Sequence, residues 1–599
     1  MESVESIHPK DVPSLTGGLT GRLTEVALEC QRALEANPAH PQALVGMSLV
    51  ALASGQAEGA VAMAQAAVRA APEMAAAWVA LGHAEKLRGK SDESESAFEA
   101  ALRLDGTDAL ARTGLGELRL AMGLPREALE EYDRALKRNP ALAAAHIGRG
   151  HALACVGRNA EALECYEVAL GFAPHVPETE FAAAFVLARM CRADEAIARY
   201  RKVLTLKQDF APAWMNLGCL LREQGQEFHA EAALLRAVEL RPEMIAGWIN
   251  LALLERDRRN AAKAEAHLWR AFALDVENGP TLLAWCQFRA AEKDLAGAWQ
   301  WLKWALARKA DDAEAVNTQG ILLHMETRYE EAIAVFEQAE RLGSHAAASN
   351  RGNSLLDLGR MEEALRAHEA ATREYPESAG AEYNLALTRL RMGDWERGWK
   401  EYEARRRFRE VMRAPMIFNV PRWKGEPLKG RRILLHAEQG LGDAIQFCRY
   451  VPLVVARGGH AIVQVHAGVE RLMRSLGTVR RGQAEVTRLG EEPPAFDVEC
   501  PLMSLPGVFG TRVETVPWMG AYLAADAEMV AAKRAEFGLN ADGGDAEGRL
   551  RVGVAWAGNP KYGADWRRST RVETLLPLLR MREVEWVSLQ KGEAAEQLK

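Results

Sequence analysis

The chain has 599 residues, of which 48% are hydrophobic and 26% charged, and its formal net charge is -7 at pH 7. A length of this order predicts about two to four domains in an ordinary globular protein. The acidic balance argues against a chain built mainly to bind nucleic acid, because such binding relies on a basic surface that neutralises phosphates.

Neither a targeting segment nor a membrane span is expected. Residues 1–5 are acidic and lack the charged-then-apolar layout of a signal peptide, and no uncharged apolar run approaches the roughly 20 residues that a membrane helix requires. The eight cysteines include no Cys-x-x-Cys pair, which argues against a metal site and a disulfide framework. We therefore expect a cytoplasmic protein without a metal centre, whose thiols are mostly buried and inert.

A repeat with a period of 34 residues runs through most of the chain. Five glycines are separated by multiples of 34: Gly82, Gly116, Gly150, Gly218 and Gly320. Small residues recur with the same period at Ala128, Ala162, Ala196, Ala230, Ala264, Ala298 and Ala332. Large residues stand four positions after most of these, at Tyr132, Tyr166, Tyr200, Leu234, Leu302 and Phe336. Self-similarity at this period predicts one supersecondary unit per repeat, each stacked on its neighbours.

This pattern resembles the tetratricopeptide repeat, which has two antiparallel helices per unit and small residues where the helices approach closely. We expect about eleven units over residues 41–410, preceded by a cap or half-repeat over residues 1–40. One unit is short, because Gly320 and Gly352 are 32 residues apart. The resemblance implies a right-handed superhelix whose inner groove, lined by the first helix of each pair, binds a peptide or protein partner.

An asparagine recurs two residues before the marker glycine position, at Asn216, Asn250, Asn350 and Asn384. In the resembling family this position faces the groove and can hydrogen-bond the backbone of an extended peptide. O-GlcNAc transferases, which combine such repeats with a glycosyltransferase domain, carry a similar asparagine ladder. Asparagine is also common at this position in tetratricopeptide repeats generally, so both interpretations of these four residues stay open.

The pattern changes after the repeats. Residues 411–430 form a basic linker that either contacts an anionic ligand or packs Trp423 on a neighbouring domain. From residue 431, short apolar strands alternate with helices, which predicts an α/β fold. We expect a helix from Asp443 to about Ala456, a Rossmann-like domain over residues 431–538, a linker over 539–549 and the start of a second Rossmann-like domain over 550–599. The expected fold class is mainly α, with this α/β region at the end.

The first strand of this region ends in His436-Ala-Glu438-Gln439-Gly440-Leu-Gly442-Asp443, followed by Cys448-Arg-Tyr-Val-Pro452. These motifs resemble bacterial tetratricopeptide proteins with a C-terminal domain akin to family 9 glycosyltransferases, the heptosyltransferase group. The resemblance implies the two-domain GT-B architecture and an inverting, metal-independent sugar transfer, with a nucleotide-sugar donor as co-substrate and no cofactor. Because the chain ends early in the second domain, we expect a fragment or an incomplete donor site.

Asp443 has two readings. It is either the general base that takes a proton from the acceptor hydroxyl, as the resemblance implies, or a helix N-cap. His436 and Glu438 either orient the acceptor or are ordinary loop groups. Further candidate substrate-binding residues are Gln439, Gly440, Gly442, Gln446, Asn559, Arg568, Ser569 and Lys591.

Two functions follow from these readings. The first is a glycosyltransferase whose repeats present a protein or glycan acceptor. The alternative is a non-catalytic interaction scaffold whose glycosyltransferase-like domain is incomplete or degenerate.

Overall fold

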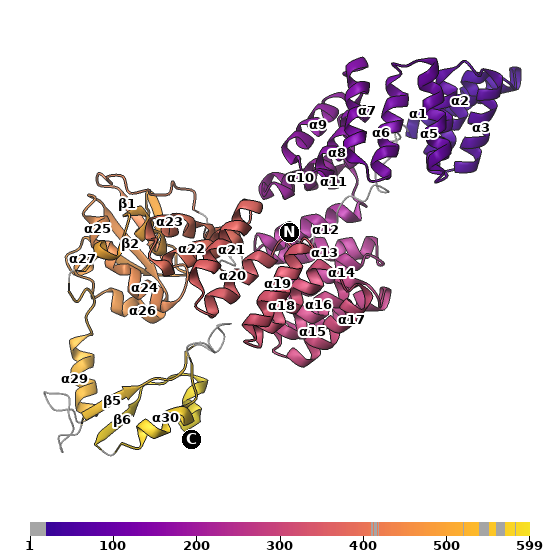
Figure 1. Ribbon diagram of the computed structural model, residues 1–599. Coiled ribbons are helices and arrows are strands. Elements are labelled where there is room, and N and C mark those ends of the chain that lie inside the picture. Colours follow the sequence, from indigo (N-terminus) through magenta and orange to yellow (C-terminus); the bar gives the residue numbers. More distant parts are fainter. Residues whose placement is uncertain are drawn as a thin grey trace. The chain divides into compact units, whose positions relative to one another are not determined.

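A computed structural model describes residues 20–408, 411, 416, 418–518, 520–537, 550–558, 569–581 and 583–598, the side chains of residues 20–23 excepted. The chain divides into two compact units, Met1–Pro415 and Met416–Lys599. The first unit is helical and the second contains two small parallel sheets (Figure 1). The expectation of a mainly helical chain is confirmed, and the small parallel sheets are compatible with the expected α/β region.

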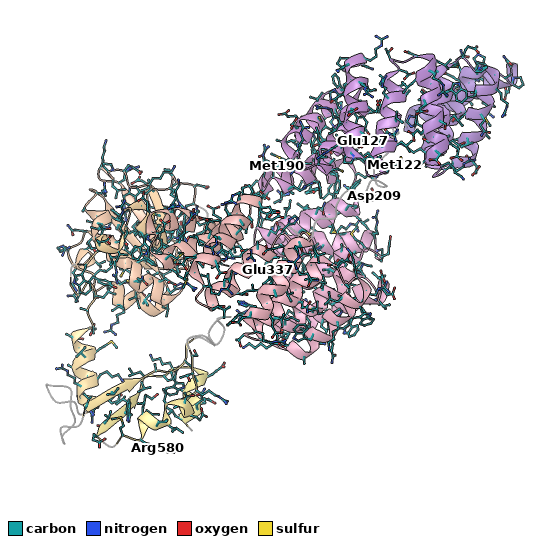
Figure 2. All side chains as sticks on the ribbon, viewed as in Figure 1. Met122, Glu127, Met190, Asp209, Glu337 and Arg580 are labelled. Atoms are coloured by element: carbon teal, nitrogen blue, oxygen red, sulfur yellow. The ribbon has the colours of Figure 1, made fainter. Side chains whose placement is uncertain are left out.

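The described part of the first unit consists of α1 (Thr20–Ala36) followed by eleven helix pairs. Met122 and Met190, labelled in Figure 2, are the C-cap residues of α6 and α10, the first helices of two such pairs. The pairs are α2 (Pro41–Ala53) and α3 (Ala57–Ala70), α4 (Ala75–Leu87) and α5 (Ser91–Leu104), α6 (Ala109–Ala121) and α7 (Pro125–Arg138), α8 (Ala143–Cys155) and α9 (Asn159–Phe172), α10 (Pro177–Arg189) and α11 (Ala193–Leu206), α12 (Ala211–Glu223) and α13 (Glu227–Leu240), α14 (Ile245–Asp257) and α15 (Ala261–Leu274), α16 (Gly279–Ala291) and α17 (Leu295–Arg308), α18 (Ala313–Met325) and α19 (Tyr329–Arg341), α20 (Ala347–Asp357) and α21 (Met361–Glu374), and α22 (Ala379–Met392) and α23 (Trp395–Glu401).

The turn inside each pair needs one residue in the left-handed conformation. Seven pairs place glycine there, at Gly55, Gly89, Gly123, Gly157, Gly225, Gly359 and Gly393, all with φ between 70° and 86°. The other four use Cys191, Arg259, Lys293 and Thr327, with φ between 56° and 65°. Since a side chain is strained in this conformation and glycine is not, these four turns are less favourable than the glycine turns.

The marker glycines allow a large side chain to pack between helices. The Phe98 ring lies against Gly82 of its own pair and Gly114 of the next, and a Cβ at either glycine would come within 2.6 Å or 2.4 Å of the ring. Tyr132 lies in the same way between Gly116 and Gly148. The large residues that recur in the sequence therefore pack directly on the glycines that recur with the same period.

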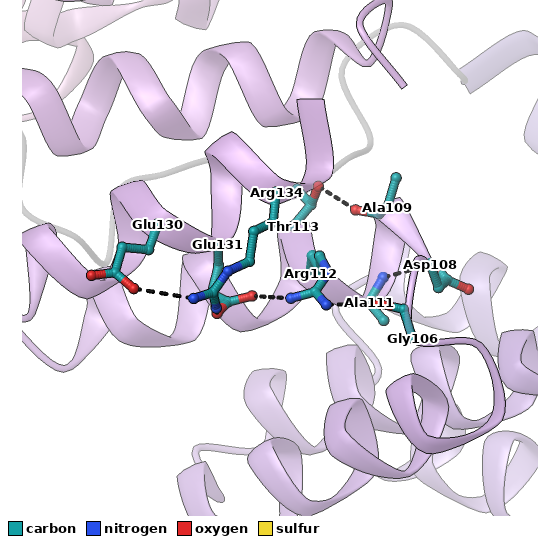
Figure 3. Close-up of polar contacts among 9 residues, drawn as sticks. All are labelled: Gly106, Asp108, Ala109, Ala111, Arg112, Thr113, Glu130, Glu131 and Arg134. Atoms are coloured by element: carbon teal, nitrogen blue, oxygen red, sulfur yellow. Dashed lines mark hydrogen bonds and ion pairs between the residues drawn. The ribbon is translucent and has the colours of Figure 1, made fainter. Parts of the chain in front are cut away.

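Polar contacts join the helices of a pair near their solvent side. Figure 3 shows Arg112 on α6, whose guanidinium donates to Glu131 on α7 at 2.9 Å and to the carbonyl of Gly106 at 2.7 Å. Arg134 donates to Glu130 at 3.3 Å along α7. Such partly exposed ion pairs contribute at most about 1 kcal/mol each, so apolar packing remains the main source of stability.

Successive first helices touch one another along the array, from α2 and α4 to α20 and α22. Within the described residues, successive second helices make fewer contacts with one another than successive first helices do. The first helices are therefore closer together than the second helices. The array accordingly curves with its first helices on the inner surface, as expected for such repeats.

The second unit is built on a four-stranded parallel sheet with the order β3-β2-β1-β4. In register, Leu435 of β1 lies opposite Val463 of β2 and Cys500 of β4. The strands are β1 (Arg432–His436), β2 (His460–Val465), β3 (Ala484–Arg488) and β4 (Val498–Pro501), and the helices between and after them are α24 (Leu441–Phe447), α25 (Val451–Val455), α26 (Ala467–Met473), α27 (Gly477–Arg480), α28 (Leu505–Val508) and α29 (Ala527–Glu536). A separate parallel pair, β5 (Leu550–Val554) and β6 (Val584–Ser588), is joined through α30 (Val572–Leu579).

The helix expected from Asp443 to Ala456 is not continuous. It begins earlier, at Leu441, and α24 ends at Phe447, where a 3-10 turn over Cys448–Tyr450 leads into α25. Pro452 lies in the first turn of α25, where its missing N–H costs no helical hydrogen bond. The prediction of one helix was therefore wrong at the proline, which begins a new helix instead.

Trp423 belongs to the second unit. Its side chain is fully buried, its indole N–H donates to the Glu426 carbonyl at 2.7 Å, and its ring lies 5.8 Å from that of Phe509. The expected packing of this tryptophan on a domain is confirmed. None of the described helices is long and apolar enough to cross a membrane.

The cysteines only partly follow the expectation of buried thiols. Cys165, Cys219, Cys286, Cys448 and Cys500 are buried, whereas Cys155 and Cys191 are exposed and Cys30 is intermediate. Burial raises the pKa of Cys286 and Cys448 to about 12, which keeps both as neutral thiols.

Candidate functional site

The four predicted groove asparagines fall into two groups. Asn216 and Asn250 are buried, 0% and 1% exposed, and their amides donate to the Tyr200 hydroxyl at 3.1 Å and the Ala246 carbonyl at 2.9 Å. They occupy the repeat position of Gly114 and Gly148, which face the second helix of the preceding pair. In this structure these two amides are directed into the packed repeats rather than presented to a ligand.

Asn350 and Asn384 are half-buried and form a ladder across three first helices. The Asn350 amide donates to Asn317 Oδ1 at 3.0 Å, which links α20 to α18. The Asn384 amide donates to the Ser349 hydroxyl at 2.9 Å, which links α22 to α20. In each bond the partner belongs to the preceding unit. It lies one position before the repeat position that Asn350 and Asn384 occupy.

That rule explains why the four asparagines differ. The residues equivalent to Asn317 and Ser349 in the units before Asn216 and Asn250 are Phe181 and Met215, which offer no polar partner. Asn317 and Ser349 were not predicted, because they lie one position before the one at which asparagine recurs. A polar residue one position earlier in the preceding unit was the signal that could have found them.

The ladder continues through a histidine on the same helices. His324 on α18 lies 2.9 Å from the Ser354 hydroxyl through Nδ1 and 3.5 Å from an Asp357 carboxylate oxygen through Nε2. Both partners lie on α20. The inner surface over α18, α20 and α22 is therefore lined by amides, hydroxyls and a carboxylate.

The inner surface over α2, α4 and α6 is different. Leu49, Leu87 and Leu110 are exposed there at 46%, 45% and 46%. The charged groups among them are Lys86 and Glu117, which form an ion pair. Because the charges of Lys86 and Glu117 cancel, this apolar part of the inner surface carries no net charge from the pair.

Two histidines flank this pair. Burial lowers the pKa of His83 and His151 to about 4, so both are neutral near pH 7. Burial also acts to raise the pKa of Glu117, but the charge and the hydrogen bond of Lys86 act against it, and the net pKa is lowered. Glu117 is therefore a carboxylate at neutral pH.

In the second unit, Asp443 lies in the first turn of α24. Its Oδ2 accepts a hydrogen bond from the Gly440 N–H at 3.0 Å. The N-cap residue of α24 is Gly440, and Asp443 is the third residue of the helix. The interpretation of Asp443 as the N-cap was therefore wrong. The carboxylate still stabilises the helix start, because it binds a backbone N–H that the helix leaves unpaired.

His436 is buried where β1 meets β4. The side chain is 2% exposed, its Nε2 lies 3.0 Å from Glu499 Oε2, and Arg422 donates to Glu499 Oε1 at 3.1 Å. Burial raises the pKa of Glu499, but its bonds to His436 and Arg422 outweigh that effect and leave the pKa below its ordinary value. The sequence analysis did not single out Glu499, which lies 63 residues from His436. In this structure the histidine joins two strands and is not presented to a substrate.

The remaining residues of the first motif surround α24. Glu438 and Gln439 are half-buried, and the Gln439 carbonyl lies 2.6 Å from His466 Nε2. Gly440, Gly442 and Gln446 are exposed. These exposed residues leave the loop before α24 open to solvent.

Arg449, in the turn after α24, is held by Tyr522. Its guanidinium donates to the Tyr522 hydroxyl at 3.0 Å and lies 4.9 Å from the centre of that ring. A hydrogen bond and a cation–π contact therefore fix the position of Arg449.

Fewer of the later candidates can be placed. Ser569 accepts a hydrogen bond from the Gly558 N–H at 2.8 Å, and Lys591 is exposed. Asn559 and Arg568 lie outside the described residues. Gln590 binds the loop after β5, accepting from the N–H groups of Trp556 and Ala557, each at 2.9 Å. Within the described residues, no group of three or more His, Cys, Asp or Glu side chains could hold a metal ion.

Parts of the first unit match tetratricopeptide repeats. Residues 45–109, 113–177, 294–347 and 349–408 match one family model described as a tetratricopeptide repeat, and residues 211–244 match another of the same description. All matched segments lie in the first unit.

Known proteins resemble parts of the chain. Protein FlbA of Caulobacter vibrioides is 28% identical over 351 residues, which cover 54% of this chain and 56% of that protein. The chain thus spans about half the length of the curated relative it matches. Among solved structures, yeast Tom70 is 15% identical, covering 66% of this chain and 92% of that chain at a TM-score of 0.37. PilF of Pseudomonas aeruginosa is 19% identical, covering 36% and 96% at a TM-score of 0.33.

Proposed function

We propose that this protein is a scaffold that binds an extended peptide of a partner protein on the inner surface of its repeats. The observation that carries the proposal is the ladder of Asn317, Asn350, Ser349 and Asn384. An asparagine side chain has two donors and two acceptor positions, and each ladder bond uses only part of them. The remaining groups suit the alternating N–H and C=O groups of an extended peptide backbone.

The test compares amides on the inner and outer helices. A peptide of about twelve residues, selected from a random library on the full chain, is labelled and titrated by fluorescence anisotropy. We expect the double variant Asn350→Ala and Asn384→Ala to weaken binding at least about tenfold, because each side chain-to-backbone bond contributes about 1 kcal/mol.

The matched control is Gln338→Ala, which removes an exposed amide from the second helix α19. It should leave the affinity unchanged. Equal losses in both variants, or no loss in either, would remove the inner surface as the peptide site.

Sugar transfer by the second unit is the second candidate. Its support is the strand order β3-β2-β1-β4 with all neighbours parallel, because ligands of such sheets bind beyond the carboxyl ends of the strands where the strand order reverses. Asp443 and the exposed Gly440 and Gly442 follow directly after β1. Within this proposal Asp443 takes the proton of the acceptor hydroxyl as that oxygen attacks the anomeric carbon of the donor sugar. The bond between this carbon and the diphosphate breaks, and the nucleoside diphosphate leaves with its electron pair.

Thermal unfolding with a panel of nucleoside diphosphates and their sugars tests this candidate. Stabilisation by at least one of them is expected, and Asp443→Asn should then abolish transfer while leaving donor affinity nearly unchanged. The control is Asp526→Asn, since Asp526 also caps a helix, accepting from the Met529 N–H at 3.0 Å. Unchanged turnover in Asp443→Asn would reduce Asp443 to its helix-stabilising role.

A further inference from the structure

Aromatic side chains gather on the second helices α15 and α17, away from the inner surface. Trp269 and Trp304 are 47% and 41% exposed. The Trp301 ring lies 6.2 Å from that of Trp269 and 5.7 Å from that of Trp304, and the Phe272 ring is 5.4 Å from that of Trp304. Trp269, Phe272, Trp301 and Trp304 are called the outer aromatic patch below.

The patch has a rigid base. Buried Trp285 on α16 stacks against Trp301 at 5.0 Å with an interplanar angle of 8°, and it meets Trp269 edge-on at 4.7 Å. Arg289 covers the Trp285 ring at 5.4 Å and is paired with Glu265 at 2.9 Å. The exposed rings are thus held in place before any partner arrives, which lowers the entropy cost of binding.

The repeat itself does not require these tryptophans. The position of Trp269 and Lys303 carries polar or charged residues in most other units, namely Gln65, Glu99, Asp133, Glu167, Arg201 and Glu337, the last labelled in Figure 2. The position of Trp304 and Arg270 carries Arg134, Lys202, Arg236 and Gln338 in four other units, and the smaller residues Ala66, Ala100 and Val168 in three. Two adjacent units therefore place an exposed tryptophan where the helix pair folds well without one.

The described charged side chains of α15 and α17 that form no ion pair are all positive. Lys263, Arg270 and Lys303 are exposed and form no ion pair within the described residues. Glu265, the acidic residue of α15, pairs with Arg289, and Glu277 pairs with Arg308 at 2.5 Å. Asp275 and Asp294, at the ends of these helices, accept hydrogen bonds from backbone N–H groups. The free charge on α15 and α17 is therefore positive, in a chain whose net charge is -7.

We propose that the outer aromatic patch is a docking surface for an acidic peptide segment that also carries apolar side chains. The apolar side chains would cover Trp269 and Trp304, and the carboxylates would meet Lys303, Arg270 and Lys263. Tryptophan and arginine are the residues that most often dominate binding at protein interfaces. This surface lies on the second helices and is independent of the peptide site on the first helices.

The probe is a labelled peptide of about twelve residues in which glutamate alternates with leucine and phenylalanine, with a lysine-for-glutamate twin as its control. Titration on the full chain should show saturable binding of the acidic peptide, weakened at least about tenfold by raising the salt from about 0.05 M to about 0.5 M. The twin should bind at least about tenfold more weakly.

The variant Trp269→Gln with Trp304→Gln uses residues that other repeats tolerate at these positions, at Gln65 and Gln338. It should weaken binding at least about tenfold without changing the thermal midpoint of unfolding. Lys303→Glu keeps both rings and should weaken binding about threefold or more. The matched control Phe228→Gln removes a 77% exposed aromatic from α13 and should change nothing.

Three results would overturn the proposal. One is binding of the acidic peptide that survives the double tryptophan variant. A second is concentration-dependent self-association of the chain that the double variant abolishes, which would make a second copy the occupant. The third is preferential binding to anionic phospholipid vesicles, lost in the same variant, which would assign the patch to a membrane surface.

Discussion

Thr327 is the clearest strained residue of the array. It is exposed, its φ is 62°, and it is β-branched, a residue type that tolerates the left-handed conformation poorly. We expect Thr327→Gly to stabilise the protein by about 0.5–1 kcal/mol, because the relief of strain exceeds the added entropy of the unfolded chain. The urea midpoint measures the change. Gly225→Ala, at a turn with φ 75°, should shift the midpoint the other way, and equal shifts of one sign would contradict this account.

Gly116 tests the contact between glycine and ring. A Cβ at this position would lie 2.8 Å from the Tyr132 ring, which is itself confined by Gly148. Gly116→Ala should therefore destabilise the protein by about 1–3 kcal/mol. Gly171→Ala, in α9 with no atom within 4 Å of the new Cβ, should instead stabilise it by up to about 1 kcal/mol. The midpoints of thermal unfolding of the two variants measure these changes, and shifts of the same sign would contradict the prediction.

His368 makes stability depend on pH. It takes the repeat position of Phe336, is fully buried and bonds to Thr388 at 2.8 Å, and burial lowers its pKa from 6.5 to about 4. In the unfolded chain His368 is protonated below about pH 6.5, whereas in the folded chain it is protonated only below about pH 4. Stability from this group is complete above pH 6.5 and falls as the pH drops, by at most about 3 kcal/mol at pH 4.

The variant His368→Phe removes this titration while keeping a ring at the site. It should show a smaller difference in urea midpoint between pH 7 and pH 4.5 than the parent. His83 and His151 shift in the same direction, so part of the acid sensitivity should remain. An unchanged pH dependence would show that His368 is protonated in the folded protein.

At the scale of elements, Glu499 connects β1, β4 and the segment that precedes the sheet. It binds His436 and Arg422, and removing one partner of a buried charge pair leaves the other uncompensated. We expect Glu499→Gln to destabilise the second unit by about 2–4 kcal/mol, seen as faster hydrogen exchange in β1 and β4. Glu485→Gln breaks an exposed pair with Arg432 and should cost less than about 1 kcal/mol. The prediction fails if the two variants behave alike.

At the scale of the whole molecule, the main contacts of each described helix pair in the first unit are with its neighbours along the chain. Stability in such an array is close to a sum of local terms. The damage of Gly116→Ala should therefore raise hydrogen exchange in α4 to α9 and leave α18 to α23 unchanged. Uniformly faster exchange along the array would show that its units unfold together.

The two ends of the inner surface differ in chemistry. Around α4 and α6 it is apolar with one internal ion pair, whereas around α18 to α22 it is lined by amides and hydroxyls. One continuous peptide along the array would thus meet apolar side chains at one end and backbone-binding groups at the other. The outer aromatic patch adds a basic, aromatic surface between these ends in sequence.

The amino-acid sequence by itself determined the repeat, its helix pairs and most strands of the second unit. Those features depend on local periodicity, since a glycine and a large residue at a constant spacing require the same contact in every unit. The edge strand β3 was not anticipated, because Ala484–Arg488 is short, mostly polar and stabilised by its pairing with β2.

The tertiary structure alone decided which of these side chains are buried between helices and which lie on the inner surface. Asn216 and Asn350 share a repeat position, yet one is buried beside Tyr200 and the other bonds to Asn317, because the neighbouring units place different side chains opposite them. The sequence left open whether His436 orients an acceptor or is an ordinary loop group, whereas its partner Glu499 comes from a strand 63 residues away. Periodicity sets where a residue lies in its own helix. Only the neighbouring element decides what that residue can do there.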